Sequence, residues 1–587
     1  MSSTVTSLKK DRKTPGVYVT EFPAFPPSIV GVATAVPVFI GYTETAVDPS
    51  SQKPVYLKAI SISSMADYTA VFGYSFDTSY VVARVNTDSS KPAIPYDFQA
   101  NITDDKGAVT LGQFVVGAQR ADELTAPIAP QFNLYMAMQL FYANGGGQCF
   151  VISVANYWDT FDVKPPVTSN PIQVSATRLI SGLTVAQDTR GPTMIVVPDA
   201  CLLAPTPGAK ETDPVVYTDY GKVVTVMLDQ ASMLQDRVAI LDLPGALDPA
   251  NWSKPGLLAM RENFYKEIAP SQDSFSYGAA YAPAVESSVL TNDDINFNNL
   301  RNTDASTETM NILLNTQAIA SYTDPATLKS VQARIAQAFP VTATGDQYAL
   351  ADTNLYPAPP TDPVKLAAYN TTLDQYLVNA VPLFGQIEQI LVGKLNSAPP
   401  SGILAGVWTA NDANRGVWHA PANISLASVI GPKVVLSDKD QGDYNAPLNG
   451  EAIDILRALV NRGTVVWGAR TLDANSLDYR YIQVRRTLIY IEQSIRTALQ
   501  QFVFAPNTGG TWTTVTAAIS NFLTNLWQSG GLMGDKVSDA FTVQCGLGST
   551  MTGLDILNGY MIVNVTVQMV HPAEFIELTF TQTMQGI

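Results

Sequence analysis

VVWGARTL at residues 465–472, followed by YIQVRR at 481–486, is the stretch that decides the fold of the C-terminal part of the chain. From Tyr481 onward, apolar residues recur at alternating steps of three and four, which is the spacing of one helix face. This stripe consists of Tyr481, Val484, Leu488, Ile491, Ile495, Ala498 and Phe502. Ser476 and Asp478 precede it as capping residues, and Pro506 follows it. The pattern predicts a buried helix of about six turns.

The same region supplies the residues that we expect to build the core and the recognisable motif of a C-terminal domain. They are Trp467, Arg470, Arg485, Arg486, Leu488, Ile495 and Phe502. Arg485 and Arg486 are adjacent on the predicted helix, so their side chains point about 100° apart. We expect one of them to bond carboxylates or carbonyls within the domain and the other to face a partner. The alternative is two solvated arginines.

Composition and charge restrict the class of protein. The chain has 587 residues, of which 46% are hydrophobic and only 15% are charged. This length favours several domains, and the balance suits a protein that buries much surface, internally or against copies of itself. The net charge of -16 argues against a nucleic-acid coat, because neutralising phosphates requires a basic surface.

The sequence offers little material for catalysis or metal binding. Its two histidines, His419 and His571, are too few for a Ser-His-Asp constellation or a His-rich zinc site. Its three cysteines are far apart in apolar surroundings, which indicates buried free thiols. The glycine-rich segment 530–536 lacks the spacing of a phosphate loop, and the acidic segment 438–449 lacks the glutamate of a calcium loop. We therefore expect no catalytic residue, cofactor or metal.

The chain also lacks signals for a membrane. The N-terminus MSSTVTSLKKDRK has no apolar region typical of a signal peptide, and no uncharged apolar run of about 18 residues occurs. We expect assembly in a bacterial cytoplasm and no direct membrane insertion.

An α/β core layer is predicted for residues 27–285. Helix and strand patterns alternate over 177–285, which favours a mostly parallel sheet. The expected elements there are strands at 193–200, 237–244 and 277–283 and helices at 219–235 and near 255–268. Earlier buried strands are expected within 28–43 and at 149–154, and a helix over 121–143.

Two regions of different character interrupt this core. Residues near 88–120 are polar and β-prone, which predicts a β-rich insertion. Residues 286–398 are rich in Asn, Thr, Asp, Ala and Pro with helical patches at 324–339 and 364–395, so we interpret them as an outer inserted domain. The core then returns over 399–446, before a C-terminal domain at 447–570 with a second apolar helix through Val515, Ile519, Phe522 and Leu526.

Both ends of the chain have the pattern of extended strand arms, at 1–26 and 571–587. Prolines isolate these alternating strands from their neighbours, so their backbone groups need a partner from elsewhere. An edge strand of the same molecule is one such partner, and a neighbouring copy is the other. The arm residues are Val17, Tyr18, Val19, Thr20 and Phe22 at the start, and Phe575, Ile576, Leu578 and Phe580 at the end. The chain is thus expected to be a multidomain α/β (α+β) protein, with a helix-plus-strand C-terminal domain and two arms.

Several motifs together resemble contractile tail sheath proteins of phages and related injection particles. They are VVWGARTL, YIQVRR, IEQSI and FVFAPN in this order, TPGVYVTE near the start, NGGGQCFV at 144–151, PPSGILAGVWTANDANRGVWHAPAN at 399–423, and HPAEFIELTF near the end. The resemblance does not extend to roughly 88–120 or 286–398.

This resemblance implies a structural protein that polymerises helically around an inner tube and contracts to drive the tube through a target cell envelope. On the family's pattern, the C-terminal domain lines the inside, and the arms pair as strands with neighbouring subunits. The implied partners are further copies of the chain, the inner tube protein, and baseplate and terminal cap proteins. We expect polar contacts with the tube and name Lys536 as a candidate.

Two other classes of function remain open at this stage. One is a non-contractile shell or capsid-like protein, which would also be rich in apolar residues and exchange arms. The other is an α/β ligand-binding protein or enzyme with its site at the sheet in 177–285, which would need a pocket with converging polar groups.

Overall fold

The computed structural model describes residues 29–76, 80–85, 96–103, 107–118, 132–158, 172–206, 215–301, 309–340, 357–575 and 577. The chain divides into two compact units. The large unit comprises residues 33–490 and 571–587, and the small unit comprises residues 1–32 and 491–570. The predicted N-terminal arm residues lie outside the described residues.

A nine-stranded sheet forms the centre of the large unit. In spatial order its strands are β13 (Ile424–Ser425), β16 (Gly463–Val466), β15 (Asp454–Leu459), β9 (Gly278–Ala282), β8 (Val238–Asp242), β7 (Met194–Val196), β1 (Pro37–Thr43), β6 (Cys149–Asn156) and β2 (Ile60–Ile62). The run from β15 to β6 is parallel, as the alternation of helices and strands predicted. Its strands are almost continuously apolar because the sheet is covered on both faces.

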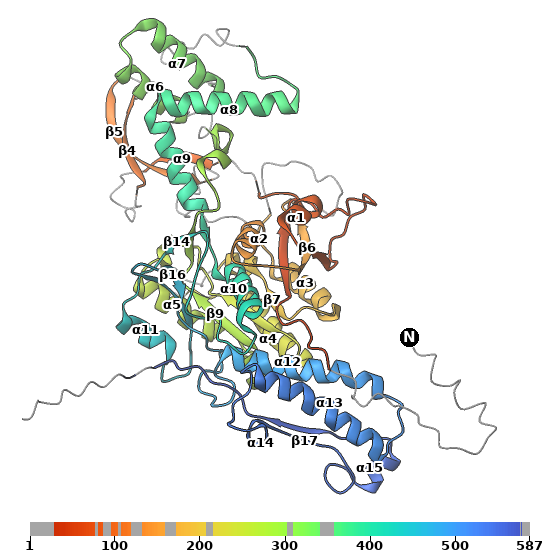
Figure 1. Ribbon diagram of the computed structural model, residues 1–587. Helices are drawn as coiled ribbons and strands as arrows, with labels where there is room; N and C mark the ends of the chain where they lie inside the picture. The colour runs from red at the N-terminus through yellow and green to blue at the C-terminus, as the bar shows by residue number, and fades with distance from the viewer. Residues whose placement is uncertain are drawn as a thin grey trace, which may run out of the picture. The chain divides into compact units, whose positions relative to one another are not determined.

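Helices cover the two faces of this sheet (Figure 1). The helices of the core are α1 (Met65–Phe72), α2 (Leu134–Ala143), α3 (Ala176–Asp188), α4 (Thr218–Leu234), α5 (Lys254–Glu267) and α10 (Pro400–Arg415). The neighbouring residues Ile40 and Gly41 of β1 show which helix covers which face of the sheet, since successive strand residues point to opposite sides. Ile40 lies against α3, whereas Gly41 lies against Leu134 of α2.

α2 and α10 approach each other closely because α10 has glycines where they meet. A Cβ atom on Gly406 would lie 2.4 Å from the carbonyl oxygen of Phe141, and one on Gly402 would lie 2.8 Å from the Cα of Ala137. Both distances are too short for any larger residue. These glycines belong to the sequence segment 399–423 that carries part of the family resemblance.

The sequence placed the whole of 447–570 in a C-terminal domain, but the structure assigns its first part to the large unit. β15 pairs in parallel with β9, and β16 pairs with β15, so residues 454–466 extend the central sheet. The chain enters the small unit only at Ile491, within α12 (Ile482–Leu499). Local sequence pattern misses this because it shows a strand without showing which sheet the strand joins. α11 (Asp438–Asn445) precedes these strands, and the short sheet β12 (Ser397–Ala398), β10 (Val285–Ser287) and β14 (Val429–Pro432) lies beside them.

The two interrupting regions form one domain with a hydrophobic core of its own (Figure 1). Its sheet has the order β11 (Leu300–Arg301), β3 (Tyr80–Arg84), β5 (Val109–Ala118) and β4 (Phe98–Thr103). Its helices are α6 (Thr309–Ser321), α7 (Pro325–Ala338), α8 (Pro363–Ala380) and α9 (Pro382–Leu395). Phe98 and Phe114 of the sheet belong to the same buried cluster as Leu377 and Leu391 of the helices. We call this the outer domain. It begins at β3, earlier than the insertion near 88–120 that the sequence predicted.

The small unit contains the second half of α12 and the second predicted helix. α13 (Gly509–Gln528) buries Val515, Ile519, Phe522 and Leu526, which confirms the predicted stripe. A two-stranded antiparallel sheet of β17 (Phe541–Gln544) and β18 (Asn564–Val567) follows, with the short helices α14 (Val537–Ala540) and α15 (Gly553–Leu557). The backbone N–H of Val32 donates to Ser494 Oγ within the same unit (3.1 Å).

Several predicted helix boundaries shift in the structure. α12 begins at Ile482 and ends at Leu499, with a single 3₁₀ turn over Gln500–Phe502, so it is shorter than predicted. Ser476 does not cap α12; its hydroxyl accepts hydrogen bonds from the N–H groups of Asp478 and Tyr479 in the preceding turn. α2 begins at Leu134, and residues 121–131 of that prediction lie outside the described residues. Among the described helices, none is long and apolar enough to cross a membrane.

Candidate functional site

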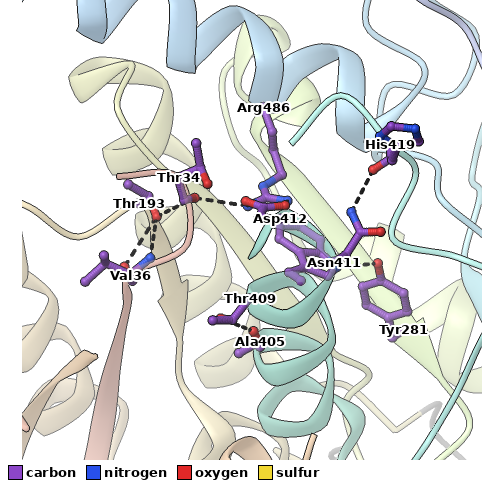
Figure 2. A network of polar contacts seen from close by, with 11 residues as sticks. Thr34, Val36, Thr193, Tyr281, Ala405, Thr409, Asn411, Asp412, His419 and Arg486 are labelled. Carbon is purple, nitrogen blue, oxygen red and sulfur yellow. Dashed lines mark hydrogen bonds and ion pairs between the residues drawn. The ribbon is translucent and has the colours of Figure 1, made fainter. Parts of the chain in front are cut away.

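Arg486 makes a buried ion pair with Asp412 (Figure 2). Its Nη1 and Nη2 donate to the two carboxylate oxygens of Asp412 at 2.9 and 2.6 Å. The two side chains are 3% and 4% exposed, and the guanidinium carbon lies 4.6 Å from the ring centroid of Trp408. A planar guanidinium suits this site, since it can bond both oxygens of a carboxylate and stack on an aromatic ring at once.

The same arginine fixes the backbone where the N-terminal segment joins the core. Nη2 of Arg486 also donates to the carbonyl oxygen of Thr34 at 3.0 Å. The Thr193 hydroxyl donates to that same carbonyl and accepts from the N–H of Val36, both at 2.8 Å (Figure 2). We call residues 33–36 the N-terminal root. The buried Arg486 on one side and the half-buried Thr193 on the other therefore hold this root immediately before β1.

A second arginine, Arg470, holds the segment where the C-terminal arm begins. Its Nε and Nη2 donate to the two carboxylate oxygens of Glu574, at 3.0 and 2.5 Å. The Tyr481 hydroxyl and the Asn445 amide also donate to this carboxylate, at 3.2 and 3.3 Å. We call residues 571–575 the C-terminal root. Its neighbours Ala573 and Phe575 are exposed, so Glu574 alone anchors this stretch of the root to the core.

The electrostatics of Glu574 favour the anchored, ionised form. Burial raises the pKa of this carboxyl group, but the hydrogen bonds and positive charge of Arg470 outweigh burial, so the net pKa is lowered. The side chains of Arg470 and Glu574 are 7% and 20% exposed. The ion pair is thus largely shielded from solvent and from salt.

Asp454, at the start of β15, is a second carboxyl group beside Arg470. Its Oδ1 accepts from the backbone N–H of Arg470 at 2.9 Å, whereas its Oδ2 is buried without a hydrogen-bond partner. Burial raises the pKa of Asp454 far above its usual value, and the charge of Glu574 adds to this effect. Burial and the charge of Glu574 therefore favour the protonated form of the Asp454 carboxyl group while Glu574 is in place.

Arg485 lies in the interior rather than facing a partner or the solvent. Its guanidinium carbon lies between two aromatic rings, 4.2 Å from the centroid of Tyr277 and 3.8 Å from that of Tyr479. Its Nη groups donate to the hydroxyls of Tyr277 and Ser276. Both arginines are thus buried in the large unit: Arg486 bonds a carboxylate and a carbonyl there, and Arg485 faces neither a partner nor the solvent.

The other predicted site residues are less buried than the sequence suggested. Trp467 follows β16 and is 37% exposed, so it is not a core residue in this chain. Leu488, Ile495 and Phe502 are half-buried, because the more deeply buried stripe of α12 runs through Ile482, Ile489 and Ile491. Lys536 is exposed, directly before α14.

The predicted C-terminal arm strand lies mostly beyond what the structure describes. Phe575 is 77% exposed and belongs to no strand, and Ile576, Leu578 and Phe580 lie outside the described residues. The sequence did not single out Asp412, Glu574, Asp454 or Thr34, although Asp412 and Glu574 fall inside two of the quoted motifs. A lone carboxylate in a motif gives no signal of the arginine that it pairs with across the fold.

Two buried aspartates occupy the edge of the sheet where an α/β enzyme would bind its ligand. Asp242 ends β8, and both of its oxygens accept from Ser401, from the backbone N–H and the hydroxyl, at the start of α10. Asp199 follows β7 and accepts from the N–H groups of Asn133 and Tyr42. Burial raises the pKa of Asp199 to about 6 and that of Asp242 to about 7.

Ligands of parallel sheets bind beyond the carboxyl ends of the strands. The contacts of Asp242 and Asp199 are therefore the ones to compare with the alternative of an α/β ligand-binding protein or enzyme. Here the carboxylates at that edge hold the backbone at the start of α10 and just before α2. Within the described part of the chain, no group of three or more His, Cys, Asp or Glu side chains is arranged to hold a metal ion.

The comparison with protein families identifies the region around α12 and the small unit. Residues 474–583 match the model of the family described as "Phage tail sheath C-terminal domain". This part of the chain is thus similar to the phage tail sheath C-terminal domain. The match contains Arg485, Arg486 and Glu574, and so covers one partner of each anchoring ion pair. The resemblance to tail sheath proteins is therefore confirmed.

Individual relatives agree with this assignment. The tail sheath protein of Burkholderia phage BcepMu is 31% identical over 143 residues, which is 24% of this chain and 30% of that protein. The chain thus spans less than a third of the length of this curated relative. The sheath complex of an extracellular contractile injection system, PVC, in the contracted state has a TM-score of 0.51 and 24% identity over 99% of both chains.

The helical sheath of the anti-feeding prophage in the contracted state has a TM-score of 0.49 and 23% identity, over 97% of this chain and 99% of that chain. The similarity to the PVC sheath extends over nearly the full length of both chains. It shows that this chain has the sheath fold and confirms the multidomain α/β class.

Proposed function

We propose that this protein is the subunit of a contractile sheath, which polymerises helically around an inner tube and contracts to drive that tube through a target cell envelope. The observation that carries the proposal is the sheath C-terminal domain at 474–583, set in a chain with the sheath fold. The protein acts structurally, and its energy source is the difference between interdomain contacts in the long and short states of the polymer.

The small unit offers a place for the arms of neighbouring copies. β17 and β18 form a sheet of only two strands, and such a pair is marginally stable alone. A bridge from Leu532 to Met569 lies just beyond β18. Strand addition at these edges by arms from other subunits would complete the sheet with main-chain hydrogen bonds.

The two anchored roots explain how arms link subunits without loosening the core. Arg486 holds the N-terminal root and Arg470 holds the C-terminal root, each through largely buried bonds. An arm beyond its root can therefore join a neighbouring copy while the core keeps its structure. Links of this kind survive a change of angle between subunits, which a contracting lattice requires.

The proposed partners follow from the same function. They are further copies of the chain, the inner tube protein, and baseplate and terminal cap proteins; among the similar structures, one is described as an anti-feeding prophage baseplate. Lys536 is exposed and remains our candidate for a tube contact. A weak polar contact suits a tube that must template assembly and then slide free, because an exposed ion pair contributes about 1 kcal/mol or less. Assembly takes place in the bacterial cytoplasm, in a phage tail or tail-like particle.

The deciding experiment removes the arms and leaves their roots in place. One variant lacks residues 1–28 and another lacks residues 576–587, so that Thr34 and Glu574 are kept. We expect both to be soluble and folded by circular dichroism, and neither to form tubes in negative-stain electron microscopy, whereas the full chain does. Tubes from either truncated protein would contradict the arm linkage. Closed shells from the full chain would contradict a contractile sheath.

A further inference from the structure

The site around Arg470 contains one buried guanidinium group and two carboxyl groups. Only one of the two, that of Glu574, binds the guanidinium group itself. Glu574 belongs to the C-terminal root and binds Arg470 through both carboxylate oxygens. Asp454 belongs to the central sheet, and its Oδ2 has no hydrogen-bond partner. Arg470 is 7% exposed, so losing Glu574 would leave an almost buried charge unpaired. Such a loss is costly unless another anion takes over.

We propose that Arg470 exchanges its counter-ion, binding Glu574 when the C-terminal root is docked and the ionised carboxylate of Asp454 when the root is released. Asp454 is in place for this role, because its Oδ1 already accepts from the N–H of Arg470 at 2.9 Å. A Cβ atom on Gly468 would lie 2.5 Å from the same oxygen, so the backbone of this turn lies directly against the carboxyl group.

The exchange moves one proton. With the root docked, Asp454 is protonated and Glu574 is ionised; with the root released, both are ionised, and the proton of Asp454 has passed to solvent water. Docking thus takes up one proton and release gives it back. Rising pH consequently favours release, by up to about tenfold in the docking equilibrium per pH unit.

The other titratable groups near Asp454 do not supply this proton. Tyr265 of α5 and Tyr281 of β9 both interact with Asp454, and burial raises the pKa of each far above its usual value, so both stay neutral. Tyr481 bonds Glu574, and its pKa is also raised by burial. His571, in the root itself, packs edge-on against the Tyr481 ring at 5.7 Å and therefore needs its own control.

That a released root serves assembly rests on the proposed function, but the exchange can be tested on the unassembled full chain. Infrared spectroscopy detects the carbonyl stretch of a protonated carboxyl group. At neutral pH we expect the difference between the wild type and D454N to contain this band. We expect the difference between E574Q and the double variant E574Q/D454N to lack it, since Asp454 is then ionised. A band of equal size in both differences would overturn the proposal, and so would its absence from both.

A second measurement reports the root directly. Chymotrypsin can cleave after Phe575 only when the residues on both sides, including Glu574, enter its cleft, so the rate of this cleavage, followed by intact mass, measures release. From about pH 6 to about pH 9, we expect the ratio of wild-type to D454N cleavage to rise at least severalfold, with E574Q cleaved fastest at the lower pH. H571Q is the matched control and should keep the rise. A constant ratio, or a rise that disappears in H571Q, would overturn the proposal.

These outcomes are separable from those of the sheath proposal. A chain that shows the counter-ion exchange but forms no tubes would contradict only the proposed function. A chain that forms tubes but shows no exchange would contradict only the inference about Arg470.

Discussion

Arg486 and Asp412 are both almost completely buried, so each charge depends on the other. Removing one partner from such a pair leaves an uncompensated buried charge, whereas replacing both with apolar residues removes the problem. The residues that anchor the N-terminal root are therefore also residues on which folding depends.

We expect Asp412→Leu or Arg486→Met to lower the free energy of unfolding by about 3–5 kcal/mol. The double variant R486M/D412L should lose much less than the sum of the two single changes. Lys222→Met is the matched control, because Lys222 pairs with Asp219 on the surface with 59% of its side chain exposed, and it should lose about 1 kcal/mol or less. Chemical denaturation of the full chain measures all four variants. Additive losses would show that the pair does not act as a unit.

The outer domain contains a buried pair of carboxyl groups, Glu388 and Asp374. The stability that Glu388 contributes falls as pH rises, which is the opposite of an acid held ionised by a positive charge. Glu388 is 1% exposed, and Asp374 accepts from the N–H of Phe297 at 2.8 Å. Burial and the charge of Asp374 raise the pKa of Glu388 from 4.5 to about 9. The folded state thus holds the proton more tightly than the unfolded state. Stability from this group is complete below about pH 4.5 and is lost as pH rises towards about 9.

The variant Glu388→Gln tests whether the stability from Glu388 is lost as pH rises. The amide keeps a donor for Asp374 but cannot lose a proton, so the variant should gain stability relative to the wild type as pH rises from about 6 to about 9. Thermal unfolding at several pH values gives the comparison. Glu262→Gln, at an exposed position in α5, is the control and should follow the wild type at every pH. If Glu388→Gln also follows the wild type, Glu388 titrates normally.

At the scale of single elements, α12 shows which part of its apolar stripe stabilises the fold. Ile491 is 2% exposed, whereas Ile495 is half-buried. Ile491→Asp should prevent soluble folding, since burying an unpaired carboxylate costs several kcal/mol. Ile495→Asp should leave a soluble protein with reduced stability. Soluble yield and circular dichroism distinguish the two, and equal damage by both would contradict the difference in burial between Ile491 and Ile495.

The sequence was sufficient to predict the ranges of helices and strands that have a local pattern of apolar residues. α4, β8 and β9 lie within one or two residues of their predicted ranges because buried strands and amphipathic helices each bury their own periodic set of residues. Pairings across the chain were not predictable. Nothing in the alternation of β15 reveals that it joins β9, and nothing near Glu574 reveals Arg470. The site residues Arg470, Arg485 and Arg486 could be named from sequence, but their partners required the fold.

At the scale of the whole molecule, the chain has two separate hydrophobic cores in its large unit. The outer-domain cluster draws on residues from both interrupting regions, whereas the central cluster takes only Ala398 from them, with Val289 and Leu290 packed against it. The excursions also begin and end at neighbouring points. The rings of Phe76 and Phe132 lie 5.6 Å apart between centroids, and Leu290 N–H donates to the Asn396 side chain at 2.9 Å.

Removing both excursions together should therefore leave the central core folded. We expect a variant with residues 79–130 and 292–394 replaced by short Gly-Ser linkers to be soluble with a cooperative thermal transition. Removing either segment alone should cause aggregation, because half of the outer core would be left exposed. Size-exclusion chromatography with circular dichroism measures this. Two soluble single deletions would mean that the segments do not depend on each other.

The closeness of those end points has an evolutionary consequence. A segment whose ends already meet adds little loop-closure entropy when it lengthens, because that cost grows only with the logarithm of length. Selection for a stable core would then act only weakly against the insertion, deletion or exchange of chain segments at this place. Homologous chains should differ here in length and composition far more than they differ between β7 and β9. The outer domain is thus where homologous proteins can acquire new surface properties without a change in the folding of the central core.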